Sequence, residues 1–152
     1  MPRIPNKVVL LICVVLIAAI AVFGWAIYRS GRVGNSGEEL ALEIAREAFS
    51  EDYPALLIEN SHPDFQQAMP EELLMRYISG TVRQTGLLQS IERIQGNTDI
   101  PLFSIDQGTY SASYEIGLNF RDIPADLLID MRFADERWLV TRFEVFALEL
   151  GN

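Results

Sequence analysis

The chain contains one cysteine and one histidine among its 152 residues, and this scarcity excludes several kinds of site. Cys13 lies inside an apolar run, so the rest of the chain can form no internal disulfide and no thiolate metal site. Because His62 is the only histidine, a zinc site built on several imidazoles is excluded too. The glycines are scattered and form no phosphate-binding loop. We therefore predict no cofactor, no metal and no catalytic residue.

Lysine is absent beyond Lys7, and basic residues are few in the part of the chain that follows Asn35. That part carries eight arginines against twenty-one acidic residues, a formal charge of −13. Such a charge repels nucleic acid and anionic lipid headgroups, because proteins bind both through basic side chains. The acidity serves solubility, or it forms a surface for a basic protein partner.

Residues Val8–Tyr28 form an unbroken run without a charged side chain. At about 1.5 Å of rise per residue, a helix over this run crosses the roughly 30 Å hydrocarbon core of a membrane. Trp25 and Tyr28 lie at its carboxyl end, where aromatic rings favour the headgroup region. The run predicts a single-pass transmembrane helix over residues 8–28 that contacts lipid, preceded by a cytoplasmic tail of residues 1–7.

A cleaved signal sequence is the alternative to a permanent anchor. Signal sequences have an apolar core of about 7 to 15 residues and small residues at the cleavage site. The present run is longer, and the bulky residues Trp25, Ile27 and Tyr28 lie where a signal peptidase requires small ones. An uncleaved signal anchor is therefore favoured.

The orientation of this anchor depends on the charges that flank it. Arg3 and Lys7 precede the run, while Arg29 and Arg32 follow it, so the positive-inside rule is nearly balanced. The short amino-terminal tail is typical of a signal anchor whose amino end stays in the cytoplasm. We expect an inner (cytoplasmic) membrane protein whose remaining domain lies outside the cytoplasm.

The segment after the anchor is polar and contains glycine, which is typical of a flexible linker over residues 29–35. Ser36 and Glu39 then have the spacing of a helix capping box, so we expect an acidic α+β domain over residues 36–152 that begins with a helix. Helical periodicity and proline positions predict three helices, over residues 37–50, over residues 54–59 and from Pro70 to about Gly80.

After Gly86 the apolar pattern changes from helical to alternating. Strands are predicted over residues 87–95, 109–120, 126–133 and 137–148. Two of them have a clear apolar face, formed by Tyr110, Ala112, Tyr114, Ile116, Leu118 and Phe120 in one and by Leu127, Ile129, Met131 and Phe133 in the other. The last strand changes phase near Trp138, which indicates a bulge or burial on both faces. Helices followed by an antiparallel meander define an α+β fold.

Four short segments resemble the nuclear-transport-factor-two-like superfamily, a cystatin-like α+β cone. They are Ala48–Tyr53, Pro70–Leu73, Gly86–Ile91 and Arg137–Phe143. The resemblance covers the chain from Ser36 to Asn152, and it implies N-terminal helices packed on a curved antiparallel sheet with a pocket between them. Members are enzymes, ligand binders or assembly subunits, and small anchored members include a subunit of type IV secretion machines. The resemblance also implies a homodimer through the sheet face, although Glu115, Asp126 and Asp130 would repel one another there.

The side chains expected to line this pocket are Tyr110, Tyr114, Phe120 and Met131. An isomerase-like site also needs a carboxylate among them, and the pattern places none there. We therefore expect a non-catalytic binding or assembly subunit of a bacterial-type envelope complex, with a protein partner. The alternatives are an isomerase-like or hydrolase-like enzyme that uses the pocket, and a carrier of an apolar ligand.

Overall fold

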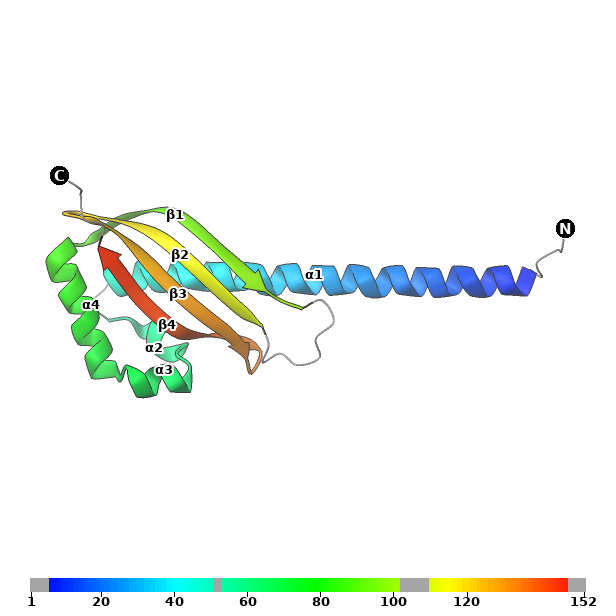
Figure 1. Ribbon diagram of the computed structural model, residues 1–152, viewed down its shortest axis with the longest axis horizontal. Coiled ribbons are helices and arrows are strands. Elements are labelled where there is room, and N and C mark those ends of the chain that lie inside the picture. The colour runs from blue at the N-terminus through cyan, green and yellow to red at the C-terminus, as the bar shows by residue number, and fades with distance from the viewer. Residues whose placement is uncertain (1–5, 51–52, 102–109, 148–152) are drawn as a thin grey trace.

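The computed structural model describes residues 6–50, 53–101 and 110–147, in which four helices precede four strands (Figure 1). The helices are α1 (Asn6–Ser50), α2 (Ala55–Glu59), α3 (Pro63–Ala68) and α4 (Glu71–Thr85). The strands are β1 (Leu88–Asp99), β2 (Ser111–Phe120), β3 (Pro124–Ala134) and β4 (Arg137–Ala147). This order confirms the predicted α+β class.

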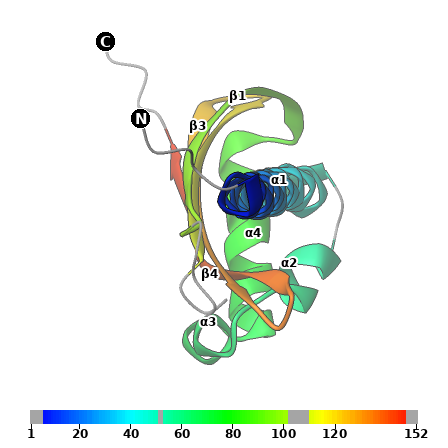
Figure 2. The same cartoon turned by 90° about the vertical axis from the view of Figure 1, so that its right-hand side faces the viewer.

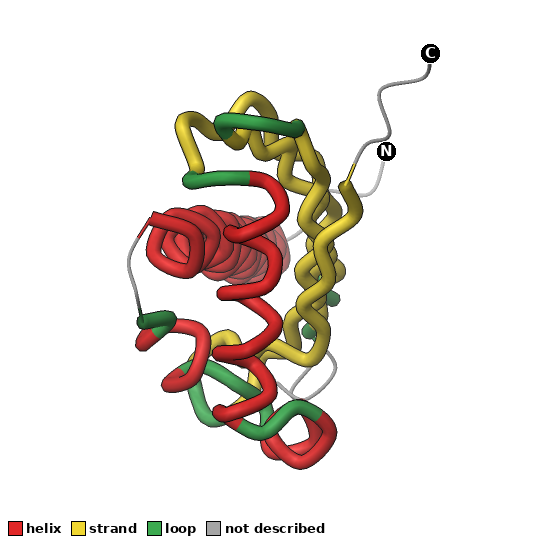
Figure 3. The backbone as a smooth tube through the Cα atoms, turned by 90° about the vertical axis from the view of Figure 1, so that its left-hand side faces the viewer, coloured by secondary structure: helices red, strands yellow, loops and turns green. Residues whose placement is uncertain are grey.

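The strands form one open antiparallel sheet in the order β1-β2-β3-β4. The helices lie on one face of this curved sheet, and α1 runs along that face (Figures 2 and 3). No helix of the described residues lies on the opposite face (Figure 2). The fold is therefore a two-layer arrangement in which helices cover one side of a meander.

The predicted apolar faces of β2 and β3 point toward the helices and are buried. The buried residues are Ala112, Tyr114, Ile116, Leu118 and Phe120 in β2, and Ala125, Leu127, Ile129, Met131 and Phe133 in β3. Strand β4 pairs with β3 and shifts register between Asp130 and Met131. This irregularity confirms the predicted bulge, and it allows Trp138, Leu139 and Val140 to be buried in succession.

Helix α1 corrects two predictions about the start of the domain. It runs without a break through residues 30–35, where a flexible linker was expected, and Ser36 lies inside the helix rather than at its cap. The Ser36 hydroxyl donates instead to the carbonyl of Val33, three residues earlier, at 2.7 Å. The helix persists because the sheet packs against this segment, a contact that the local sequence does not reveal.

Two further elements differ from the sequence prediction. Helix α3 was not predicted, and it begins where His62 accepts a hydrogen bond from the backbone N–H of Asp64 through Nδ1 at 3.2 Å. Pro63 occupies the first helical position, where its missing N–H costs nothing. Strand β1 ends at Asp99, four residues beyond the predicted end, because Gln95–Asp99 continue the ladder with β2.

The apolar part of α1 extends away from the sheet and α2–α4 (Figure 1). Its side chains from residue 12 to 28 are exposed, apart from that of Ala26. By length and composition this helix can cross a membrane, and a signal sequence has the same properties. At about 1.5 Å per residue, the 45 residues of α1 extend over roughly 67 Å, about twice the thickness of a membrane core.

Candidate functional site

The face of α1 that lies on the sheet contains several small residues beside the larger Ile44 and Phe49. Gly37, Ala41, Ala45 and Ala48 are buried there at helical spacing. A Cβ atom placed on Gly37 would lie 3.0 Å from Cε2 and Nε1 of Trp138 and 3.1 Å from Oη of Tyr114. Because Gly37 has no side chain, α1 approaches Trp138 and Tyr114 of the sheet closely at this position.

Two polar side chains of the sheet fix the segment of α1 that follows the apolar run. Nε1 of Trp138 donates a hydrogen bond to the carbonyl of Val33 at 2.9 Å. The Tyr114 hydroxyl donates to the carbonyl of Gly34 at 3.4 Å and shares a hydrogen bond of 3.0 Å with Thr98. Val33 lies five residues beyond Tyr28, a distance of about 8 Å along the helix. The sheet is thus attached to α1 close to the end of the apolar run.

The four predicted pocket residues all lie in the core between the helices and the sheet. Tyr110, Tyr114, Phe120 and Met131 are each less than 5% exposed. Phe120 meets Phe49 of α1 edge to face, with ring centroids 5.2 Å apart. Tyr110 stacks on Phe133 at 5.8 Å. These side chains belong to the hydrophobic core.

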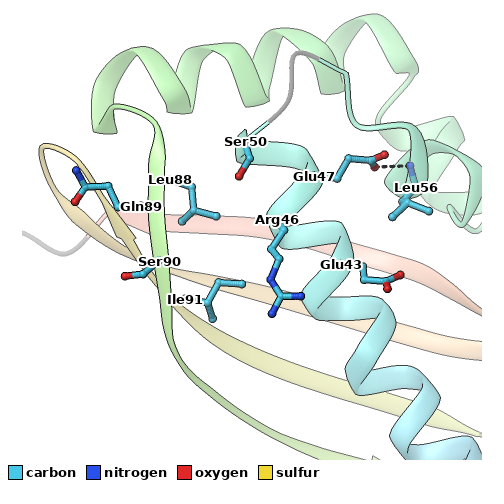
Figure 4. A pocket seen from close by; sticks show the side chains of 9 residues that line it. All are labelled: Glu43, Arg46, Glu47, Ser50, Leu56, Leu88, Gln89, Ser90 and Ile91. Atoms are coloured by element: carbon cyan, nitrogen blue, oxygen red, sulfur yellow. Dashed lines mark hydrogen bonds between the residues drawn. The ribbon is translucent and has the colours of Figure 1, made fainter.

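A groove lies elsewhere, on the solvent side of α1 near its carboxyl end (Figure 4). We call it the α1–β1 groove, and its volume is about 530 Å³. Its lining residues are Glu43, Arg46, Glu47 and Ser50 of α1, Leu56 of α2, and Leu88, Gln89, Ser90 and Ile91 of β1. None of the four predicted pocket residues lines it, and no motif in the sequence predicts it.

The polar groups of the α1–β1 groove have different roles. Oε2 of Glu47 accepts a hydrogen bond of 2.6 Å from the backbone N–H of Leu56, near the start of α2. Arg46 is exposed and points toward Ile91, and no carboxylate among the described residues forms an ion pair with it (Figure 4). The groove thus offers one free guanidinium, two hydroxyls and a small apolar surface. These groups suit hydrogen-bonded and ionic binding.

We expect Glu47→Ala to lower the free energy of unfolding by about 1 kcal/mol, because α2 loses a side-chain acceptor for its first turn. Glu47→Gln retains an acceptor oxygen and should lose less than half as much. Urea unfolding of both variants measures the difference. Equal losses would show that the hydrogen bond to Leu56 does not support α2.

Two tyrosines have pKa values raised above the ordinary range. The hydrogen bond that Tyr53 donates to Glu71 raises its pKa, with smaller contributions from burial and from the charge of Glu71. Burial raises the pKa of Tyr114, the hydrogen bond with Thr98 lowers it in part, and the charge of Glu38 raises it. Both groups therefore favour the neutral form in the folded state.

A raised folded-state pKa stabilises the fold below the unfolded-state pKa, and this stabilisation is lost as the pH rises through the folded-state value. Stability should therefore fall from about pH 10 upward, where tyrosine ionises in the unfolded chain. Absorbance at 295 nm should show a late phase of tyrosine ionisation that becomes smaller in Tyr114→Phe. An unchanged late phase in this variant would contradict the placement of the Tyr114 hydroxyl against α1.

The helix-free face of the sheet carries carboxylates interleaved with arginines. Arg93 contacts Glu115 at 2.9 Å and Asp126 at 3.0 Å. Its side chain crosses Gly117, where an added Cβ would lie 2.8 Å from Cγ of Arg93. Arg142 lies 3.9 Å from Asp130 and 2.7 Å from Glu144. The carboxylates expected to repel a second copy are therefore partly neutralised within the chain.

His62, the single histidine, has a structural role at the start of α3. Its backbone N–H donates to the carbonyl of Val140 at 2.8 Å, and its ring caps α3. Among the described residues, no three His, Cys, Asp or Glu side chains gather in a way that could hold a metal ion.

Comparison with known proteins found no matching protein family, no matching curated protein and no matching solved structure. The fold defines the chain as an α+β protein with a long apolar N-terminal helix and a four-stranded antiparallel sheet. Membership of the nuclear-transport-factor-two-like superfamily stays a prediction.

Proposed function

We propose that this protein is a single-pass inner-membrane protein whose acidic, nuclear-transport-factor-two-like domain lies outside the cytoplasm. Its function is that of a non-catalytic binding or assembly subunit of an envelope complex. The observation that carries the proposal is α1, which is one helix from the apolar run to the core of the domain. A domain attached in this way keeps a constant height and orientation above the membrane, which suits a subunit that meets neighbouring proteins.

The packing of the interior supports binding over catalysis. Phe49 lies between Phe120, at 5.2 Å, and Phe143, at 5.9 Å, so aromatic rings fill the space between α1 and the sheet. An isomerase-like site would need a carboxylate and an open cavity at this place. The α1–β1 groove, by contrast, presents polar groups at the surface.

Chemical cross-linking of the full-length protein in its native membrane tests this proposal. A reproducible link between residues 36–152 and one other protein is the expected result. Links only between copies of this chain, or no links, would contradict it and redirect attention to small apolar ligands of the domain.

The proposed orientation has its own test. A reporter enzyme that is active only outside the cytoplasm, fused after Asn152, should be active. Activity of a reporter that works only in the cytoplasm would overturn the orientation.

A further inference from the structure

The two edges of the sheet differ in what covers them. At the β4 edge, the N–H of Val140 donates to the carbonyl of Asn60 at 2.7 Å, and the N–H of Val145 donates to the Tyr77 hydroxyl at 2.7 Å. Among the described strands, β1 forms the other edge and pairs only with β2. No described group outside β2 hydrogen-bonds to the backbone of β1. Its outer edge is therefore available to another strand.

Only part of this edge is regular enough to accept a strand. Register shifts interrupt β1 between Leu88 and Ser90 and between Ile91 and Arg93. From Ile94 to Asp99 the ladder with β2 is unbroken, and four of these six residues are exposed. Six residues extend over about 20 Å, the length of an ordinary strand. We call the segment Ile94–Asp99 the open edge.

The surroundings of the open edge carry negative charge. Glu92 and Asp99 are exposed and form no ion pair with any described residue. Besides burial, the negative charge of Glu38 in α1 raises the pKa of the Tyr114 hydroxyl. This hydroxyl is hydrogen-bonded to Thr98 within the open edge. The one arginine of β1, Arg93, is held by Glu115 and Asp126. A basic partner is therefore attracted to this edge.

A second copy of this chain does not fit the open edge when both copies are anchored in one membrane. Two β1 strands that pair antiparallel are related by a two-fold axis perpendicular to the sheet. Helix α1 lies along the sheet, so this axis reverses its direction (Figures 1 and 2). The two apolar runs would then point in opposite directions. The occupant is therefore a different protein.

The open edge also lies near the end of the apolar run. A Cβ on Gly34 would lie 4.0 Å from Cγ2 of Thr98 and 3.9 Å from Cδ1 of Ile100. Gly34 is six residues beyond Tyr28, about 9 Å along the helix. A segment that pairs with the open edge therefore lies close to the membrane surface.

We propose that the open edge, Ile94–Asp99, binds an extended basic segment of another membrane protein as a fifth strand of the sheet. Backbone hydrogen bonds supply the pairing, and Lys or Arg side chains of the segment face Glu92, Asp99 and Glu38. This inference rests on the proposed assembly function and names the class of its partner.

Site-specific photo-cross-linking of the full-length chain in its native membrane tests the proposal. p-Benzoylphenylalanine replaces Gln95 or Asn97 within the open edge, and Gln67 of α3 or Gln84 of α4 as exposed controls. The same partner should be captured from both edge positions and from neither control, and mass spectrometry should place the link in a basic, juxtamembrane segment. Asp99→Arg should reduce the yield about fivefold. Glu59→Arg, the same charge change at the end of α2, should leave the yield unchanged.

The other outcomes overturn the inference in distinguishable ways. A partner captured only from Gln67 or Gln84 would refute the open edge as the binding site and leave the assembly function standing. Links from Gln95 or Asn97 to a second copy of this chain would show that the open edge mediates self-association and would refute a different protein as its partner. A yield that Asp99→Arg does not change would refute the basic segment. No partner from any position would contradict the assembly function itself.

Discussion

Replacing Gly37 with leucine is expected to lower the free energy of unfolding by roughly 3 kcal/mol. The new side chain meets Trp138 and Tyr114, whose nearest atoms lie 3.0 to 3.1 Å from the added Cβ. Overpacking of this kind costs about 1–3 kcal/mol. Separation of α1 from the sheet also breaks the hydrogen bond from Trp138 to Val33, which contributes about 1 kcal/mol. The gain in helix propensity, less than about 1 kcal/mol, does not compensate.

Gly80→Leu is the matched control, because Gly80 also lies inside a helix and no atom beyond its chain neighbours and the nearby helix backbone lies within 4 Å of its added Cβ. This variant should be as stable as the wild type or slightly more stable. Unfolding in urea can be followed by tryptophan fluorescence in a Trp25→Phe background, in which Trp138 is the sole reporter. Equal effects of the two leucines would mean that α1 does not approach Trp138 closely.

Replacing Gly96 with alanine is expected to cost 3 kcal/mol or more, taking the upper range for overpacking as a guide. An alanine Cβ would overlap Cδ1 of Tyr114 and would lie 2.6 Å from the Ser113 carbonyl oxygen. Neither neighbour can move freely, since Tyr114 is hydrogen-bonded to α1 and Ser113 belongs to the ladder between β1 and β2. In an ordinary strand the same substitution stabilises by about 0.5–1 kcal/mol, so the expected sign is reversed.

Asn97→Ala serves as the comparison for Gly96→Ala. Asn97 is exposed and pairs with Ser113 on the helix-free face, so its replacement should change stability by less than about 0.5 kcal/mol. Thermal and urea unfolding measure both variants. A stabilising Gly96→Ala would refute the position of the Tyr114 ring over β1 and, with it, the attachment of α1 to the sheet.

The sheet was largely predictable from the sequence, because its signals are local. Alternation in β2 and β3 identifies the buried face directly, and Ile116 and Leu127 illustrate it as paired residues that are fully buried. The phase change around Trp138 revealed the bulge in β4. The acids outside the core, such as Asp126 and Asp130, were also assigned correctly to the opposite face.

The connection between the anchor and the domain could not be predicted, because it depends on contacts between distant residues. Gly31 and Gly34 suggest a linker locally, yet Val33 is fixed by a residue 105 positions away. In a linker Gly31 and Gly34 would provide flexibility, whereas in the structure both lie inside the continuous helix α1.

The candidate site was missed for a related reason. The apolar pattern of the strands predicted a pocket in the sheet interior, where Phe120 and Met131 are buried core residues. The α1–β1 groove joins Arg46 to Leu88, which are far apart in the chain. The only available signals were the polarity of β1 and the lack of regular alternation in it.

The measurement that tests the central claim most directly is the distance between the apolar run and the domain. Nitroxide labels on Tyr28 and Gln84, in a Cys13→Ser background, can be measured by double electron–electron resonance with the full-length protein in lipid nanodiscs. A continuous α1 attached to the sheet predicts one narrow distance distribution, which broadens when Gly-Ser-Gly-Ser is inserted between Arg29 and Ser30. A broad distribution in the uninterrupted chain would show that residues 30–35 are a flexible linker and would contradict the account of α1 as a rigid support for the domain.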